Sequence, residues 1–191
     1  MLRYCVFVMD ASAAMLGTDL LPTRLSAACT AASHFAEQWF DQNPVGSMSL
    51  VCICKNVSFT LVPLTSISRR ICEALSALGG QGAQAGPAPA QAITAMSALG
   101  GACGTGSFSM QAALEGAMHE LSLVPAAGHK EVLLLHAALS SVDAGDVTTA
   151  IAAAAANDIT VHVIGLAGEV YLSKKTTQVR SFCQLIIAPG R

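Results

Sequence analysis

The sequence predicts an α/β fold, in which helices cover both faces of a doubly wound, mostly parallel sheet with one antiparallel edge strand. Apolar, β-branched runs recur along the chain and alternate with segments of helical periodicity. The runs lack a polar alternate face, which is typical of parallel strands covered on both sides. Only Lys55 and Asn56 separate the second run from the third, and so short a link predicts a hairpin at the sheet edge.

The predicted strands are these runs, each bounded by turn-forming or charged residues. Their side chains are mostly aliphatic, with cysteine and aromatic residues among them. In chain order the strands are residues 4–9, 48–54, 58–62, 131–137, 159–166 and 183–188.

The first helix is predicted from Pro22, a residue that suits the first helical turn, and it ends before Asn43 and Pro44. Its apolar residues recur three and four positions apart and so form one buried stripe. The stripe comprises Leu25, Ala28, Cys29, Ala32, Phe35, Ala36 and Trp39.

Further helices are predicted over residues 68–78, 109–121, 146–157 and 172–179. Ser109 is suited to cap the helix over 109–121, and we expect Glu115 and Glu120 on the outer face of that helix. Its inner face is formed by Met110, Ala113, Leu114, Ala117 and Leu121.

A stretch rich in glycine, alanine and proline lies at about residues 79–106. Such a composition buries little and orders poorly, so it predicts a flexible insertion, with a short helix near residues 91–99. The strand pattern resumes after it. We therefore expect residues 1–191 to form a single domain.

The composition is apolar for a soluble domain, with 53% hydrophobic and 12% charged residues and a mean hydropathy of +0.55. Charged residues nevertheless interrupt every apolar run well before the roughly 20 residues that a spanning helix needs, so no membrane segment is expected. The formal charge of -2 supplies no basic field for phosphates and disfavours direct nucleic-acid binding. A protein partner is the favoured interpretation.

The first residues lack the pattern of a signal peptide, which predicts a reducing compartment and free thiols for the 7 cysteines. None of them shows the paired spacing of a zinc site. Cys52 and Cys54 fall on one face of a strand and are interpreted as core residues. Likewise, His136 and His162 lie in predicted buried strands and are interpreted as core histidines.

An incomplete metal motif follows the first strand. Asp10 and Ser12 provide oxygen ligands of the kind that Mg²⁺ prefers, but Ala14 stands where a further oxygen would complete the set. In an open α/β sheet this loop lies in the crevice where ligands bind, and Ser107 or Ser109 can reach it with a hydroxyl. The site is degenerate, and we expect neither a metal nor another cofactor.

The fourth strand has no aspartate at its tip, since Asp143 and Asp146 come several residues later. We interpret both as exposed residues that cap the following helix. Enzyme motifs are also missing: the sequence contains no HExxH, no nucleophile with a partnered base, and no phosphate loop with its lysine. These observations favour a non-catalytic protein.

The first strand and its DxSxA loop resemble those of von Willebrand factor A domains. From about Val6 to Val170, successive blocks are similar to one family, the Ssl-type regulatory subunit of the transcription and repair factor TFIIH. Three unusual strings occur in the family's order, and only the last strand is similar in pattern alone. The blocks are DASAAMLGTDLLPTRL, FAEQWFDQNPVGSMSL, GSFSMQAALEGA, KEVLLLHAALSSVDAGDV and ITVHVIGLAGEV, and the strings are FDQNP, SSVDAGD and VIGLAGEV.

This resemblance implies a nuclear, non-catalytic regulator that binds the XPD helicase and stimulates its unwinding in transcription initiation and nucleotide excision repair. Other TFIIH subunits are implied as partners. The family's cysteine-rich zinc region does not occur in these 191 residues. A truncated chain and a reduced homologue both fit that difference.

The resemblance also implies where the helicase binds, namely the loop after the central strand and the start of the next helix. Short side chains there allow close backbone approach, and acidic residues at the rim can pair with basic groups. The alternatives are an ordinary connector with helix caps and, for the protein as a whole, a metal-dependent adhesion-type module using Asp10 and Ser12. The proposed partner residues are Ser140, Ser141, Val142, Asp143, Ala144, Gly145 and Asp146.

Overall fold

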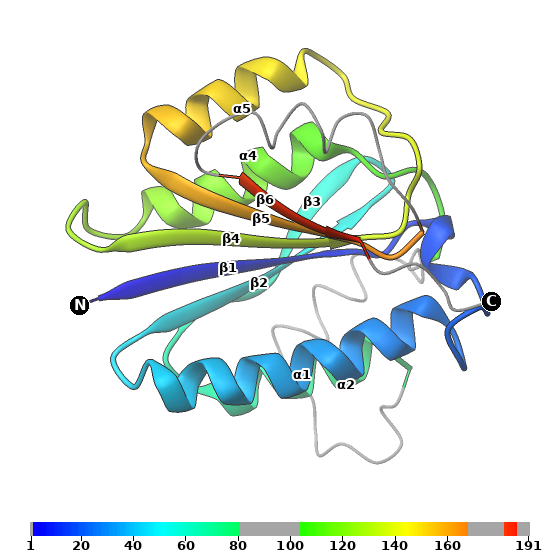
Figure 1. Cartoon of the computed structure of the whole chain (residues 1–191), viewed down its shortest axis with the longest axis horizontal. Coiled ribbons are helices and arrows are strands. Elements are labelled where there is room, and N and C mark those ends of the chain that lie inside the picture. Colours follow the sequence, from blue (N-terminus) through cyan, green and yellow to red (C-terminus); the bar gives the residue numbers. More distant parts are fainter. Residues whose placement is uncertain (1, 81–103, 168–181, 187–191) are drawn as a thin grey trace.

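A computed structural model describes residues 2–80, 104–167 and 182–186. Six strands form one sheet in the order β3-β2-β1-β4-β5-β6 (Figure 1). The predicted doubly wound α/β architecture is confirmed. The strands are β1 (Arg3–Asp10), β2 (Ser47–Cys54), β3 (Val57–Thr65), β4 (His129–His136), β5 (Ile159–Gly165) and β6 (Phe182–Ile186).

All neighbouring strands are parallel except β2 and β3. The turn between these two consists of Lys55 and Asn56, which both have positive φ angles, of 50° and 63°. Two successive positive φ angles define the tight turn whose twist matches that of the adjoining strands. The predicted antiparallel hairpin at the sheet edge is therefore confirmed.

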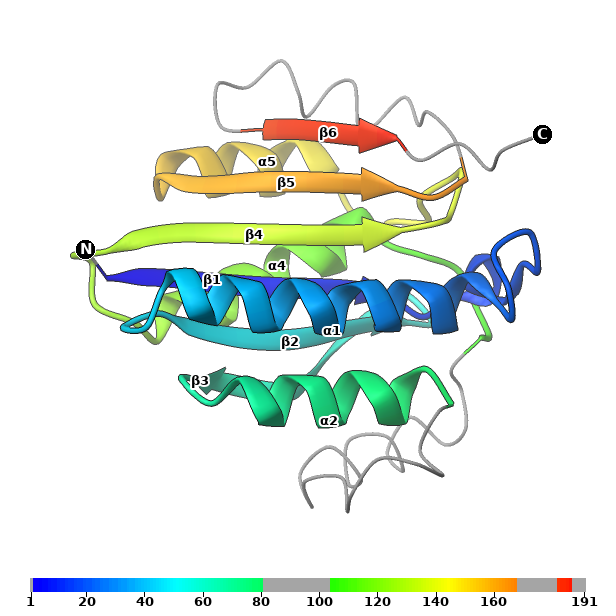
Figure 2. The same ribbon diagram turned by 60° about the horizontal axis from the view of Figure 1, so that its bottom comes forward.

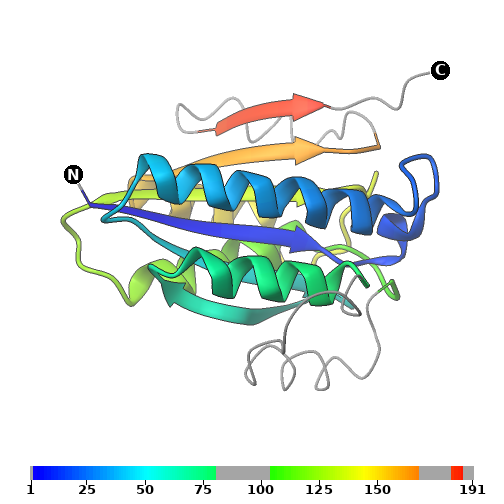
Figure 3. The same cartoon turned by 90° about the horizontal axis from the view of Figure 1, so that it is seen from below.

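Helices cover both faces of the sheet, with α1 and α2 on one face and α4 and α5 on the other (Figures 1 and 3). The chain steps from β1 to β2 in one direction across the sheet and from β4 to β5 in the other. Because both connections are right-handed, the helices that follow β1 and β4 lie on opposite faces of the sheet. The described helices are α1 (Arg24–Gln42), α2 (Ser68–Leu78), α4 (Met110–Ser122), α5 (Val147–Ala156) and the short 3-10 helix η1 (Ala13–Leu16).

The start of α1 differs from the prediction. Thr23 is the N-cap, and its side chain accepts a hydrogen bond from the Ser26 backbone N–H at 3.1 Å. Pro22 follows a cis peptide bond and precedes this cap, so it lies outside the helix. Asn43 ends the helix as predicted. The predicted helices at 172–179 and 91–99, and most of the insertion at 79–106, lie outside the described residues.

Two apolar cores lie on opposite faces of the sheet. Phe7 and the α1 stripe belong to the first core, while Val8 and the α4 stripe belong to the second. Among the described residues, none of the helices is both long and apolar enough to cross a membrane.

The expectation that Glu120 lies on the outer face of α4 is wrong. Its side chain is 5% exposed, because α4 packs across β2 and β3. The carboxylate accepts a hydrogen bond from the Thr60 hydroxyl at 2.8 Å. The Ser49 hydroxyl, which donates to the Val62 carbonyl at 3.0 Å, lies 3.3 Å from the same carboxylate. The interior thus supplies the polar partners that a buried acid requires. Glu115, in contrast, is exposed as predicted.

We predict that Glu120→Ala lowers the free energy of unfolding by about 1 kcal/mol, because the Thr60 hydroxyl loses its acceptor and the packing of a buried side chain is removed. Glu115→Ala, on the exposed face of the same helix, should change it by less than about 0.5 kcal/mol. Urea unfolding of the two variants measures the difference. Equal effects would show that the Glu120 contacts contribute nothing to stability.

Candidate functional site

The candidate site lies at the carboxyl ends of β1 and β4, where the strand order reverses. Open α/β sheets bind ligands in the crevice at this position. Asp10, the last residue of β1, is fully buried there. One carboxylate oxygen accepts a hydrogen bond from the Ser12 backbone N–H at 2.8 Å, and the other accepts one from the Ala137 backbone N–H at 3.2 Å. Asp10 therefore ties the loop after β1 to the loop after β4.

The chain that returns from the insertion is also bonded to this crevice. The Gly104 N–H donates to the Ala11 carbonyl at 2.8 Å, and the Ala13 N–H donates to the Gly106 carbonyl at 3.2 Å. The Asn56 N–H of the hairpin turn donates to the Ser107 carbonyl at 3.2 Å. Backbone groups from three separate loops thus meet at one edge of the sheet.

The side chains of the degenerate metal motif supply few oxygens for a magnesium ion. Both Asp10 oxygens already accept backbone N–H groups, and Ala14 offers no oxygen. The Ser109 hydroxyl is turned to Asp143, to which it donates at 2.7 Å. Ser12 retains a buried hydroxyl that has no partner among the described residues. One such hydroxyl is far from the octahedral oxygen set that Mg²⁺ requires. Among the described residues there is also no group of three or more His, Cys, Asp or Glu side chains that would hold a metal.

His136, the last residue of β4, lies at the same edge of the sheet as Asp10. It is 2% exposed at the end of β4, where its ring stacks on Phe108 with centroids 5.2 Å apart. Its Nδ1 lies 3.2 Å from the Ala138 carbonyl oxygen, which can only accept, so Nδ1 bears the proton. Burial lowers the pKa of His136, although the Asp10 charge and the bond to Ala138 act the other way. The prediction of a core histidine is confirmed here, whereas His162 is only half-buried.

We predict that this neutral histidine makes the fold sensitive to mild acid. Because the folded state disfavours protonation, stability from His136 is complete above its unfolded pKa, near 6.5, and declines as the pH falls below that value. Wild type should lose stability between about pH 6.5 and 5 more steeply than His136→Asn, which cannot take up the proton. Thermal melts across that range measure it. Parallel pH profiles would contradict the assignment.

The loop that joins β4 to α5, residues 139–146, is fastened to the first turn of α4. One Asp143 oxygen accepts from the Ser109 hydroxyl and from the Gln111 backbone N–H, at 2.7 and 2.9 Å. The Ser141 hydroxyl accepts from the Met110 backbone N–H at 2.7 Å. The negative charge of this carboxylate is also stabilised by the positive end of the α4 helix dipole. The β4–α5 loop thus acts as a cap for another helix.

The loop backbone is held by two further bonds to the same region. The Val142 N–H donates to the Phe108 carbonyl, and the Gly145 N–H donates to the Gln111 side-chain oxygen, each at 2.8 Å. The loop is therefore anchored at Ser141, Val142, Asp143 and Gly145.

The prediction for Asp143 was consequently wrong, and that for Asp146 is confirmed. Asp143 is half-buried and caps α4, which precedes it in the chain, because the crevice brings the two loops together. Asp146 is exposed and caps α5, accepting from the Thr148 N–H at 2.9 Å.

Two large apolar side chains project from the fastened loop. Leu139 is 65% exposed and Val142 is 49% exposed. Ser140, Ala144 and Gly145 between and beside them are also exposed. The loop therefore exposes two large apolar side chains as well as the Asp146 carboxylate.

Comparison with known proteins shows the family. The family model described as Ssl1-like matches residues 8–188. The chain belongs to the Ssl1-like family. It is 31% identical over 178 residues to general transcription factor IIH subunit 2 of Arabidopsis thaliana. The matched region covers 93% of this chain and 37% of the relative. It is also 30% identical over 174 residues to general transcription and DNA repair factor IIH subunit ssl1 of Schizosaccharomyces pombe. That match covers 91% of this chain and 36% of the relative. This Ssl1-like chain thus spans little more than a third of these two relatives.

Solved structures place the Ssl1-like chain among von Willebrand factor A domains. The SpRpn10 VWA domain superimposes with a TM-score of 0.69 at 16% identity, covering 100% of this chain and 90% of that one. The TFIIH p34 N-terminal domain superimposes with a TM-score of 0.63 at 17% identity, covering 96% and 90%. The expected fold family is confirmed.

We predict that Asp143→Ala lowers the free energy of unfolding by about 1–2 kcal/mol, because the start of α4 loses its capping carboxylate. Asp143→Asn retains an oxygen acceptor and should lose less. Chemical unfolding compares them with Ser140→Ala, an exposed change in the same loop. A cost for Ser140→Ala equal to that for Asp143→Ala would count against the capping role.

Proposed function

We propose that this domain is a non-catalytic, nuclear regulatory subunit of TFIIH that binds the XPD helicase through the β4–α5 loop and stimulates its unwinding. The setting is transcription initiation and nucleotide excision repair, with other TFIIH subunits as further partners and no direct contact to nucleic acid or membrane. Family membership supports this role, since both curated relatives are named as subunits of factor IIH.

The observation on which the proposal rests is the fastened but exposed β4–α5 loop. Its backbone is bonded to α4, while Leu139 and Val142 extend into solvent. A loop that is already ordered loses little conformational freedom on binding, so more of its contact energy appears as affinity. Apolar side chains beside the Asp146 carboxylate suit a partner patch of aliphatic and basic groups.

We further propose that the domain acts without a bound metal. The Asp10 carboxylate, which a metal would need, already accepts two backbone N–H groups. Ala14 supplies no oxygen, and the Ser109 hydroxyl donates to Asp143. The adhesion-type alternative therefore has less support, and calorimetry with magnesium tests it: a saturable signal in wild type that Asp10→Ala abolishes would restore it.

The proposed interface predicts that Val142→Glu weakens binding to purified XPD at least about tenfold, since a buried charge would replace an apolar contact. The matched control is Ala152→Glu, on an exposed position of α5. Both variants should melt like wild type, because both positions are exposed. Calorimetric titration and ATP-driven unwinding measure the effect.

Two results would overturn the proposal. Wild-type domain that neither binds XPD nor changes its unwinding would remove the regulatory function. Equal loss of binding in Val142→Glu and Ala152→Glu would keep the function and remove the β4–α5 loop from the interface.

A further inference from the structure

A small pocket lies where the start of α4 meets the β2–β3 hairpin turn and the β4–α5 loop. Its volume is about 210 Å³. It is lined by Asn56 of the hairpin turn, Glu115 of α4, and Val142 and Asp143 of the loop. Glu115 and Val142 are exposed, so the rim of the pocket reaches solvent beside an apolar side chain of the proposed interface. We call this feature the α4 pocket.

The walls of the α4 pocket are held in place by hydrogen bonds within the chain. The Asn56 N–H donates to the Ser107 carbonyl at 3.2 Å. The Gln111 side chain joins α4 to the loop, because it donates to the Glu115 carboxylate and accepts from the Gly145 N–H, each at 2.8 Å. A ligand therefore meets walls that are already ordered, and it loses little binding energy in ordering them.

The same walls carry hydrogen-bond acceptors that are not used. The Asn56 Oδ1 atom is buried and has no partner among the described residues. Such an acceptor is costly and calls for an explanation. Asn56 as a whole is only partly buried, and rotation about its soft χ2 torsion can present this oxygen to a ligand. Asp143 and Glu115 each use a single carboxylate oxygen in their bonds to other described residues.

The pocket is negatively charged and holds no cation of its own. Glu115 and Asp143 are both acidic, and none of the described residues that line the pocket is basic. A positively charged ligand complements this arrangement. A metal ion suits it less well, since no group of three or more His, Cys, Asp or Glu side chains occurs in the described part of the chain. The expected ligand is therefore a cationic side chain.

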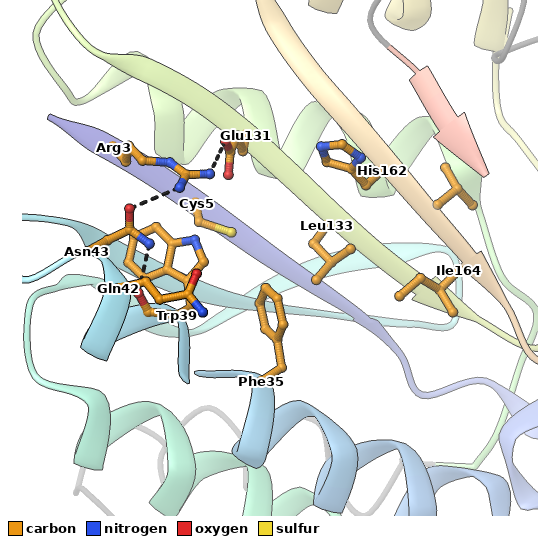
Figure 4. A pocket seen from close by; sticks show the side chains of 11 residues that line it. Arg3, Cys5, Phe35, Trp39, Gln42, Asn43, Glu131, Leu133, His162 and Ile164 are labelled. Carbon is orange, nitrogen blue, oxygen red and sulfur yellow. Dashed lines mark hydrogen bonds and ion pairs between the residues drawn. The ribbon is translucent and has the colours of Figure 1, made fainter. Parts of the chain in front are cut away.

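Another site in the molecule shows which cation suits such acceptors. The Arg3 guanidinium donates to the Asn43 side-chain oxygen at 2.9 Å and to the Glu131 carboxylate (Figure 4). A guanidinium has five N–H donors in a planar fork, so it reaches acceptors on several sides at once. A lysine ammonium is a compact and strongly hydrated charge. The α4 pocket offers the same two kinds of acceptor, in Asn56 and Glu115.

We propose that the α4 pocket receives an arginine side chain of the partner that binds the β4–α5 loop. The guanidinium bonds to the carboxylates of Glu115 and Asp143 and to the amide oxygen of Asn56. The aliphatic stem of the arginine packs against Val142, as the stems of long cationic side chains do on apolar surfaces. The inference rests on the proposed function, because it names the chemistry by which the same surface recognises its partner.

The first test removes one charge from the pocket. Glu115→Gln should weaken binding to purified XPD about tenfold at low salt, and the loss should shrink as salt screens the ion pair. The matched control is Glu37→Gln, an equally exposed change on α1, which lies on the opposite face of the sheet from α4 (Figure 2). Calorimetric titration measures binding. Both variants should melt like wild type, because both positions are exposed.

The second test removes the amide oxygen. Asn56 has a φ angle of 63°, which glycine adopts readily, so Asn56→Gly preserves the hairpin turn. The variant should bind XPD several-fold more weakly than wild type. Its melting temperature should not fall, because the oxygen that is lost has no partner among the described residues of the free domain.

A third measurement needs no helicase. N-acetyl-arginine amide is titrated into the ¹⁵N-labelled domain, and N-acetyl-citrulline amide, a neutral molecule of nearly the same shape, is its control. The arginine compound should shift the amide signals of Asn56 and Glu115 saturably, whereas the citrulline compound should not. Glu115→Gln should weaken the response to the arginine compound.

The outcomes separate the pocket from the proposed function. Equal XPD binding by wild type and Glu115→Gln, with Val142→Glu impaired, would overturn the pocket and keep the function. Saturable binding of the arginine compound by a domain that does not bind XPD would support the pocket and remove the helicase as its partner. Equal responses to arginine and citrulline would overturn the choice of a guanidinium. Equal losses in Glu115→Gln and Glu37→Gln would show an effect of net charge alone and overturn the site.

Discussion

The carboxylate of Asp10 is the contact on which the arrangement of the crevice depends. It is buried at the point where the strand order reverses, and its two oxygens hold the backbones of the loops after β1 and β4. The loop after β4 is also bonded to the first turn of α4. Hydrogen bonds therefore connect the buried Asp10 carboxylate, through this loop, to the surface that we propose as an interface.

The fold was predictable from sequence because its signals are local. Apolar runs without polar alternation, the two-residue turn at Lys55 and Asn56, and the Ser109 cap each need only a few neighbouring residues to be recognised. The site was harder to predict, since its contacts join residues far apart in the chain. Asp143 caps a helix that begins 33 residues before it, at Met110, and no spacing rule indicates such a pairing.

Glu120 shows the same limitation for the core. Helical periodicity placed it outside, but a helix lying over the edge pair β2 and β3 buries a wider arc than its apolar stripe. The hydroxyls of Ser49 and Thr60 come from two other strands, so their match to this acid appears only in three dimensions. The burial of His136 could be predicted from the sequence, because this residue ends an apolar central strand.

The bonding of Gly104 to Ala11 has a consequence for protein engineering. The chain re-enters the fold at a fixed point, because Gly106 is bonded to the same loop after β1 and Ser107 to the hairpin turn. The register of the chain that follows is therefore set locally. An affinity tag or a fluorescent domain inserted between residues 81 and 103 is therefore joined to a re-entry point at Gly104 that is fixed by bonds outside the inserted stretch. Such an insertion leaves the first and last residues of the chain and the β4–α5 loop unmodified.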